Sequence, residues 1–250
     1  MTYNGFAYVY DELMRDTPYD QWVDFVLRQA KKYQVEADRI LDLACGTGEL
    51  SVWLAEAGYK VTGVDLSEDM LSVANAKASE KGLSIEFFQQ DMTELEGFDA
   101  FDVITIFCDS LNYLQTEEAV ISTFQRVYEH LQPNGLFLFD VHSLYKMNDI
   151  FLNGPFVLND DDVSYIWHCF AGEFPNSVEH ELSFFVLDDK SGLYKRIDEL
   201  HMQRTYPIDQ YVTWLEGNGF EVLEIGADFT NKTPQPESER IFFTARKKSQ

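Results

Sequence analysis

The most informative segment of this chain is Leu41-Asp42-Leu43-Ala44-Cys45-Gly46-Thr47-Gly48-Glu49-Leu50. A short apolar run over residues 39–44 leads into it, and a helix-like pattern over residues 49–57 follows. Glycines and small residues at such a strand-to-helix turn let backbone N–H groups come close to a bound ligand. The stretch therefore predicts a ligand-binding turn between a parallel strand and its crossover helix.

Strand-like and helix-like segments alternate on both sides of this turn. A helix is predicted before it, over residues 20–33, with Thr17 as its cap and Pro18 in its first turn. After it, further strands are predicted at 59–64, 85–88, 101–107 and 136–141, and further helices at 67–81 and 117–131. Apolar strands that alternate with helices form a parallel sheet covered on both faces, so we expect a doubly wound α/β fold.

The pattern changes after residue 143. Three strand-like runs follow one another at 163–170, 178–187 and 194–204, with turn-type residues and no crossover helix between them. A helix returns from residue 207, and two closing strands follow at 220–225 and 240–246. We expect residues 1–143 and 205–250 to form the α/β core. We expect residues 144–204 to form an inserted antiparallel β subdomain, either a lid on the ligand crevice or a stabilising or dimerising flap.

The charge of the chain limits the kinds of partner that it is expected to bind. Its 250 residues include 19 Lys and Arg against 43 Asp and Glu, a formal charge of −24 at pH 7. Binding to a phosphate backbone or an anionic membrane requires clustered basic residues, so both kinds of partner are disfavoured. We expect no membrane span, no targeting segment and no metal site, and we interpret Cys45, Cys108 and Cys169 as reduced thiols of a cytoplasmic protein.

Three acidic residues follow the predicted strands. Asp65 ends the second strand, where a carboxylate suits the two hydroxyls of a ribose. Asp42, at the tip of the first strand, suits an ammonium group, and Asp91, after the third, can accept from an exocyclic amine such as adenine N6. A dinucleotide site is the rival interpretation. It is disfavoured because Ser51 replaces the third small residue of that motif and because acids beside the turn would repel a pyrophosphate.

Together these motifs resemble the class I S-adenosylmethionine-dependent methyltransferases. The resemblance rests on residues 41–50, 64–67, 90–92, 101–114 and 131–137. It implies a Rossmann-like seven-stranded sheet in the order 3-2-1-4-5-7-6 with strand seven antiparallel, and S-adenosyl-L-methionine as the cofactor. Residues 3–11 and 108–114 are similar to a smaller group of small-molecule methyltransferases with a β-sheet inserted after strand five, which includes amino-sugar N-methyltransferases and glycine/sarcosine-type enzymes.

The resemblance also implies roles for individual residues. Asp65 would bind the ribose, Asp42 the methionine ammonium group and Asp91 the adenine. The other cofactor-binding candidates are Tyr10, Ala44, Cys45, Gly46, Gly48, Leu66, Met70, Gln90, Met92 and Phe107, and Tyr3, Phe6 and Tyr8 are candidates to cover the cofactor. Asp109, Tyr113 and His142 are the candidates for acceptor binding. Asp109, which could orient an amine, and His142, which could take its proton, are the candidate catalytic groups.

We therefore predict an enzyme that transfers a methyl group to a nitrogen or oxygen atom of a small-molecule acceptor, with an amine as one candidate. The alternatives are an RNA methyltransferase, a non-catalytic protein that binds the same cofactor, and a nicotinamide oxidoreductase. A homodimer formed through the inserted sheet is a candidate assembly.

Overall fold

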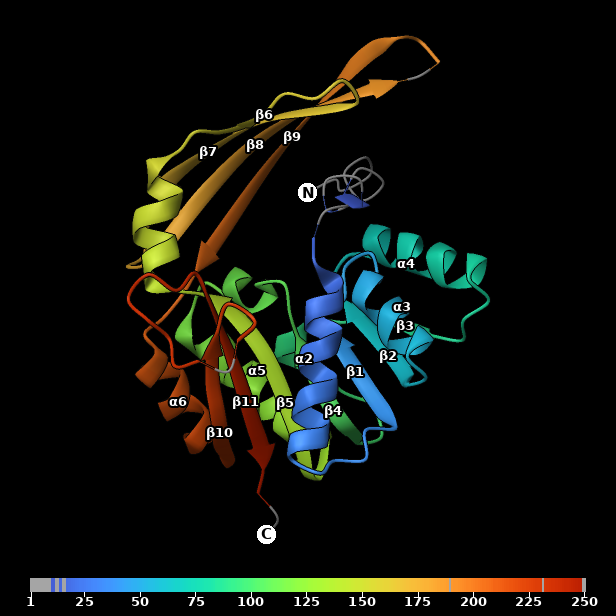
Figure 1. Cartoon of the computed structure of the whole chain (residues 1–250), viewed down its shortest axis with the longest axis vertical. Coiled ribbons are helices and arrows are strands. Elements are labelled where there is room, and N and C mark those ends of the chain that lie inside the picture. Colours follow the sequence, from blue (N-terminus) through green and yellow to red (C-terminus); the bar gives the residue numbers. More distant parts are fainter. Residues whose placement is uncertain (1–9, 12–13, 15–16, 189, 231, 249–250) are drawn as a thin grey trace.

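A seven-stranded sheet forms the centre of the protein (Figure 1). The computed structural model describes residues 10–11, 14, 17–188, 190–230 and 232–248. The strands of this sheet are β1 (Arg39–Leu43), β2 (Lys60–Asp65), β3 (Glu86–Gln89), β4 (Phe101–Ile106), β5 (Leu131–His142), β10 (Phe220–Ala227) and β11 (Arg240–Lys247). Their order is β10-β11-β5-β4-β1-β2-β3, and β11 runs antiparallel to both of its neighbours. The predicted fold class and the strand order implied by the resemblance are confirmed.

Helices cover both faces of this sheet because its strands are apolar on both sides. The helices are α2 (Tyr19–Lys32), α3 (Glu49–Glu56), α4 (Glu68–Glu80), α5 (Glu117–His130) and α6 (Ile208–Gly217). Strand β5 illustrates the two-sided burial: Leu136 and Leu138 belong to the core under α2 and α3, whereas Phe137 and Phe139 belong to the core under α5 and α6. This alternation locks the register of β5, since a shift by one residue would exchange the two faces.

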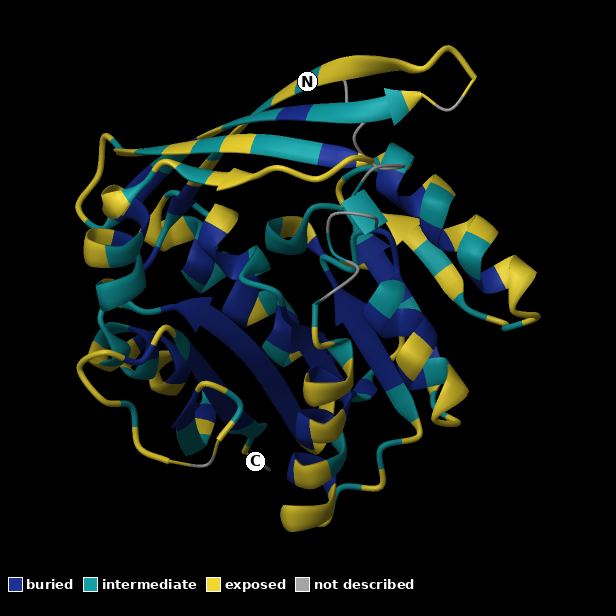
Figure 2. Cartoon of the chain, turned by 45° about the horizontal axis from the view of Figure 1, so that its top comes forward, coloured by how far each residue is buried: buried dark blue, intermediate teal, exposed yellow. Residues whose placement is uncertain are grey.

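A second, four-stranded antiparallel sheet lies over the carboxyl ends of the central strands (Figure 2). It consists of β6 (Phe156–Leu158), β7 (Val163–Ala171), β8 (Ser177–Asp188) and β9 (Leu193–Arg204), in that order. The pairing places Tyr165 opposite Phe184 and Cys169 opposite His180, so these side chains share one face of the sheet.

The inserted segment contains more structure than its sequence predicts. Two helical turns (Lys146–Ile150 and Phe151–Asn153) and the short strand β6 precede the three predicted strands. Strand β6 escapes sequence reasoning because it has only three residues, and Val157 and Leu158 in it are exposed, so it carries no burial pattern. It is defined by its pairing with β7 alone.

The predicted cap at Thr17 is wrong. Pro18 itself occupies the position before the first helical residue of α2, and no side chain caps that end. The Thr17 hydroxyl lies one residue too far out and donates instead to the sulfur of Met14 (3.6 Å).

Within the described residues, no helix is both long enough and apolar enough to cross a membrane. Nor does the same part of the chain bring together three or more His, Cys, Asp or Glu side chains that could hold a metal ion.

We expect Gly63→Ala to destabilise the fold by about 1–3 kcal/mol through overpacking. A Cβ atom at Gly63, in the middle of β2, would lie 2.5 Å from the Phe87 ring and 3.0 Å from the Cys45 sulfur. The matched control is Gly217→Ala at the end of α6, where no heavy atom lies within 4 Å of the added Cβ. The control should be neutral or stabilising by up to about 1 kcal/mol. Urea unfolding measures both, and equal effects would contradict the packing argument.

Candidate cofactor and acceptor site

A cavity of about 760 Å³ lies at the carboxyl ends of the central strands, between them and the inserted sheet. This volume lies within the range of roughly 300–1,000 Å³ that is common for ligand pockets. Every candidate site residue that the structure describes lines it, except Gly48. Tyr3, Phe6 and Tyr8 lie outside the described residues.

The glycine turn after β1 forms one wall of the cavity. Gly48 has a φ of +72°, and a Cβ there would lie 2.8 Å from the Ala74 side chain, so this position requires glycine. Gly46 also has a positive φ, +54°, and a Cβ there would point into open space. Gly48 therefore shapes the turn from behind, while Gly46 presents bare backbone to the cavity.

The Asp65 carboxylate, at the end of β2, ties two turns together. Its Oδ2 accepts a hydrogen bond from the Gly46 N–H (2.8 Å), and its Oδ1 accepts from the Ser67 N–H (2.8 Å). Burial raises the pKa of Asp65, although these two bonds oppose the shift. Next to it, the Leu66 side chain is 65% exposed on the cavity beside the nearly buried Met70, and this apolar surface suits a flat ring.

Asp42 lies deeper, at the end of β1. It is 2% exposed and accepts hydrogen bonds from the Ser51 hydroxyl (2.6 Å) and the Thr105 hydroxyl (3.2 Å). Burial raises the pKa of Asp42 to about 6, against the effect of these hydroxyls. Burial and the nearby carboxylates of Asp42 and Asp65 also raise the pKa of the Cys45 thiol well above its usual value, which makes it a poor nucleophile.

The polar side chains of the loop after β3 form hydrogen bonds within that loop. Asp91 Oδ1 accepts from the Thr93 N–H (2.8 Å) and the Thr93 hydroxyl (2.7 Å). The Gln90 amide exchanges two hydrogen bonds with the backbone of Glu96. Gln90, Asp91 and Met92 all line the cavity, so this loop forms part of its wall.

An ionic link that sequence reasoning missed fastens Asp11 to the glycine turn. Asp11 accepts a hydrogen bond from the Thr47 hydroxyl (2.6 Å) and pairs with Lys77 of α4 (2.8 Å), and Lys77 also pairs with Glu49 (2.6 Å). The preceding residue, Tyr10, packs with the cluster formed by Met70 of the core and Phe184 of the inserted sheet.

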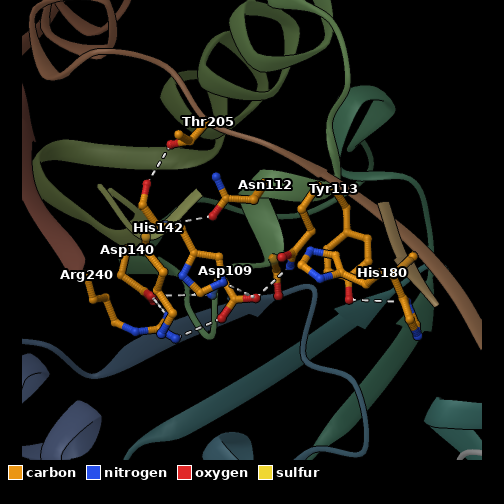
Figure 3. A network of polar contacts seen from close by, with 12 residues as sticks. Asp109, Asn112, Tyr113, Asp140, His142, His180, Thr205 and Arg240 are labelled. Atoms are coloured by element: carbon orange, nitrogen blue, oxygen red, sulfur yellow. Dashed lines mark hydrogen bonds and ion pairs between the residues drawn. The ribbon is translucent and has the colours of Figure 1, made fainter. Parts of the chain in front are cut away.

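Asp109, in the loop after β4, is the centre of a polar network at the other end of the cavity (Figure 3). Its Oδ1 accepts from Arg240 (2.9 Å), and its Oδ2 accepts from Gln203 (2.7 Å) and lies 3.2 Å from His142 Nε2. Burial raises the pKa of Asp109, but His142, Arg240 and Gln203 outweigh it and hold this pKa well below its usual range. Asp109 is therefore an ionised carboxylate with both oxygens bound.

Arg240 and Asp140 hold Asp109 in place, and neither was predicted from the sequence. Arg240, at the start of β11, also pairs with the fully buried Asp140 of β5. Asp140 in turn accepts from the Trp22 indole (3.2 Å) and from the Asp109 backbone N–H (3.3 Å). The available signal was a lone carboxylate inside the apolar run 136–141, since a buried charge requires a partner.

His142, at the end of β5, is held in place by its neighbours. Its backbone N–H donates to Asn112 (2.9 Å), and its carbonyl accepts from the Thr205 hydroxyl (2.6 Å). Burial lowers the pKa of His142 and Asp109 raises it, with a net lowering, so the ring is neutral at pH 7. Since Nε2–H donates to the ionised Asp109, the other ring nitrogen, Nδ1, is a lone-pair acceptor. It is buried and has no hydrogen-bond partner among the described residues.

The fold and the cavity define a class: a doubly wound α/β protein that binds a nucleoside cofactor at a glycine turn, with an acid at the end of the second strand. The comparisons with known proteins agree. A family model described as a methyltransferase domain matches residues 40–135. The chain is 59% identical to a protein named as a methyltransferase in Geobacillus sp. (strain WCH70), over 99% of this chain and 100% of that protein.

Solved structures extend the comparison. A S-adenosylmethionine-dependent methyltransferase from Clostridium acetobutylicum ATCC 824 is 34% identical, with a TM-score of 0.89 over 99% of each chain. A sugar N-methyltransferase from Streptoalloteichus sp. ATCC 53650 has a TM-score of 0.79 over 97% of this chain and 93% of its own, but at 20% identity it shows the fold alone. The chain belongs to the S-adenosylmethionine-dependent methyltransferase family, and it is an enzyme that uses S-adenosylmethionine as its cofactor.

The residues present fit this cofactor. S-adenosylmethionine joins an adenine and a ribose to a sulfonium and an amino acid head, so it carries positive charge and no phosphate. The cofactor end of the cavity offers carboxylates at Asp42 and Asp65, bare backbone at Gly46 and an apolar surface at Leu66 and Met70.

We expect Asp65→Ala to weaken the binding of S-adenosylhomocysteine by roughly 10- to 100-fold. The variant loses a charged hydrogen-bond acceptor, worth about 1.5–3 kcal/mol, and frees the glycine turn that this carboxylate holds. Isothermal titration calorimetry measures the affinity. The control is Asp99→Ala, at an exposed position away from the cavity, which should bind as the wild type does. Wild-type affinity in Asp65→Ala would contradict this role.

We expect the affinity for S-adenosylhomocysteine to rise as the pH increases through about 6, because Asp42 gains its charge there and then attracts the ammonium group. Stability should change in the opposite sense. The folded-state pKa lies above the unfolded value of about 3.9, so the free energy of unfolding should fall between about pH 4 and about pH 6. Asp42→Asn should flatten both changes. The same two pH profiles in Asp42→Asn as in the wild type would rule out this carboxylate as their source.

Proposed function

We propose that this methyltransferase modifies a nitrogen or oxygen atom of a small-molecule acceptor that binds between the loop after β4 and the inserted sheet. The proposal rests on the Asp109–His142 pair, which leaves one buried ring nitrogen unpartnered in the described part of the cavity wall. The −24 charge of the chain speaks against the alternative RNA acceptor, because it offers a phosphate backbone little attraction.

In this proposal, the cofactor end of the cavity binds and orients S-adenosylmethionine. Asp65 accepts from the ribose hydroxyls, Asp42 pairs with the ammonium group, and Leu66 and Met70 lie against the adenine, with Asp91 at its amine. The remaining cofactor contacts are assigned to Tyr10, Ala44, Cys45, Gly46, Gln90, Met92 and Phe107, with Gly48 shaping the turn. The bound cofactor supplies a methyl group already activated by its sulfonium, so the protein has to position the acceptor and exclude water.

His142 serves as the general base at the acceptor end. Its Nδ1 is the lone-pair acceptor that takes the proton from the acceptor, and Asp109 fixes the ring and stabilises the imidazolium that results. Arg240 holds Asp109 in place from the other side and does not reach the reacting atoms itself in this arrangement. Tyr113 contributes an aromatic wall beside Asp109.

The inserted segment, residues 144–204, forms the roof of the acceptor site in this proposal. Tyr165, Trp167 and His180 of β7 and β8 line the cavity from above, opposite the loop after β4. A roof of this kind excludes water from the reacting atoms. Residues 1–143 and 205–250 then act as the core that binds the cofactor.

An isotope-labelling experiment tests the proposed function. The protein is incubated with a bacterial extract and S-adenosylmethionine that carries a labelled methyl group, and label is measured in the dialysable fraction, the RNA and the protein. We expect label in the dialysable fraction, and less label with Asp65→Ala when S-adenosylmethionine is kept below saturation. We expect a loss of at least about 100-fold with His142→Gln, since general bases contribute about 10²–10⁴-fold. His142→Gln should still bind S-adenosylhomocysteine normally.

Label found only in RNA or only in protein would overturn the small-molecule acceptor. Unchanged labelling by His142→Gln would leave the acceptor class standing and overturn the role of the base.

A further inference from the structure

We infer that one edge of the inserted sheet binds a second copy of this chain. Strand β9 of one copy pairs antiparallel with β9 of the other, about a two-fold axis that passes at Ile197. The inference goes beyond the proposed function, since neither the cofactor nor the acceptor enters it. It gives the homodimer that the sequence suggests a defined surface and a defined register.

Strand β9 forms one edge of the inserted sheet, where it pairs with β8 (Figure 1). In the described part of the chain, the backbone of residues 194–200 hydrogen bonds to β8 alone. The core occupies the edge only further along, where the Gln115 side chain donates to the Met202 carbonyl (2.8 Å). A strand edge with unpaired N–H and C=O groups is a template for another strand, so residues 194–200 are open to pairing.

The side chains on the outer face of this edge are exposed. Ile197 lies on the inner face, where it packs with the cluster around Phe184, so residues with even numbers point outward. Tyr194 and Leu200 are 53% and 54% exposed. Natural edge strands are usually short or covered, whereas β9 has twelve residues and leaves these two apolar side chains in water.

The charges of β9 are arranged symmetrically about Ile197. Lys195 and Arg196 precede it, and Asp198 and Glu199 follow it. In an antiparallel pair centred on Ile197, Arg196 lies opposite Asp198 of the second copy, and Lys195 lies opposite Glu199 of that copy. The two-fold axis repeats both pairs. Side chains that lie directly opposite share a face and interact, so every charge in this stretch meets the opposite charge.

The neighbouring registers put like charges opposite each other. When the axis moves by one residue toward the N-terminus, Arg196 faces Arg196 of the second copy, and when it moves by one toward the C-terminus, Asp198 faces Asp198. Like charges in these positions destabilise a strand pair. Charged side chains can also serve to block an edge, but that use requires no particular order of signs. The order found in β9 therefore specifies one partner strand and one register.

The same register covers the exposed apolar side chains. It places Tyr194 opposite Leu200 of the second copy, twice, on the outer face. Arg196 also lies 2.9 Å from Asp198 of its own chain, so the four side chains around the axis form a network of alternating charge. Networks stabilise more than isolated exposed pairs, which contribute little. The pairing joins two four-stranded sheets into one continuous sheet above two cavities.

Sedimentation equilibrium of the full chain tests the inference. We expect the wild type to pass from monomer to dimer between about 1 and about 200 µM, since a contact confined to one strand edge is small. Asp198→Arg should raise the dimer dissociation constant at least about fivefold, because both Arg196 pairs change from attraction to repulsion. Adding Arg196→Asp to this variant exchanges the two charges and should restore the wild-type dissociation constant.

The matched control is Glu181→Arg, which makes the same change of charge on the outer face of β8, inside the sheet. It should leave the dissociation constant unchanged. A monomer at every concentration would overturn the inference. So would a dimer that Asp198→Arg does not weaken, a dimer that the charge exchange does not restore, or equal weakening by Glu181→Arg, which would reveal a general effect of charge.

Discussion

The site depends on the buried carboxylate of Asp109. Four segments far apart in the sequence meet at it: the loop after β4, the end of β5, the end of β9 and the start of β11, which bring Asp109, His142, Gln203 and Arg240 together. Cys108 and Asp109 both have φ values of +54°, a conformation that costs about 1–3 kcal/mol for residues other than glycine. Burying the charges costs more. The network of hydrogen bonds and ion pairs around Asp109 compensates for both and fixes the loop in one conformation.

This network also divides the cavity into two ends with different electrostatics. At the cofactor end, Asp42 and Asp65 receive only neutral donors, hydroxyls or backbone N–H groups, so their negative charge is available to a cationic ligand. At the acceptor end, the single cation Arg240 lies between the carboxylates of Asp109 and Asp140, and both oxygens of Asp109 receive donors from the protein. The carboxylates beside the glycine turn are thus free of cationic partners among the residues that these bonds name, whereas Asp109 is tied to Arg240.

Much of this fold could be predicted because its signals are local. Residues 136–141 alternate between two buried faces, and the glycines of residues 41–50 shape a turn whose conformation few other residues can adopt. Strand β6 could not be predicted, because a three-residue edge strand is defined only by its partner. The resemblance added the strand order, which no local pattern contains, since pairing joins residues as distant as Arg240 and His142.

The class of fold, the position of the glycine turn and the acids around it follow from the sequence alone, because strand periodicity, glycine turns and acids at strand ends are properties of short segments. The sequence also identified Asp109 and His142 as candidates. Their states depend on the folded structure: Arg240 and Gln203, from later strands, bind both oxygens of Asp109, and burial beside this carboxylate leaves His142 neutral. The reason is physical: the charge and protonation of a buried group depend on which distant side chains surround it and exclude water.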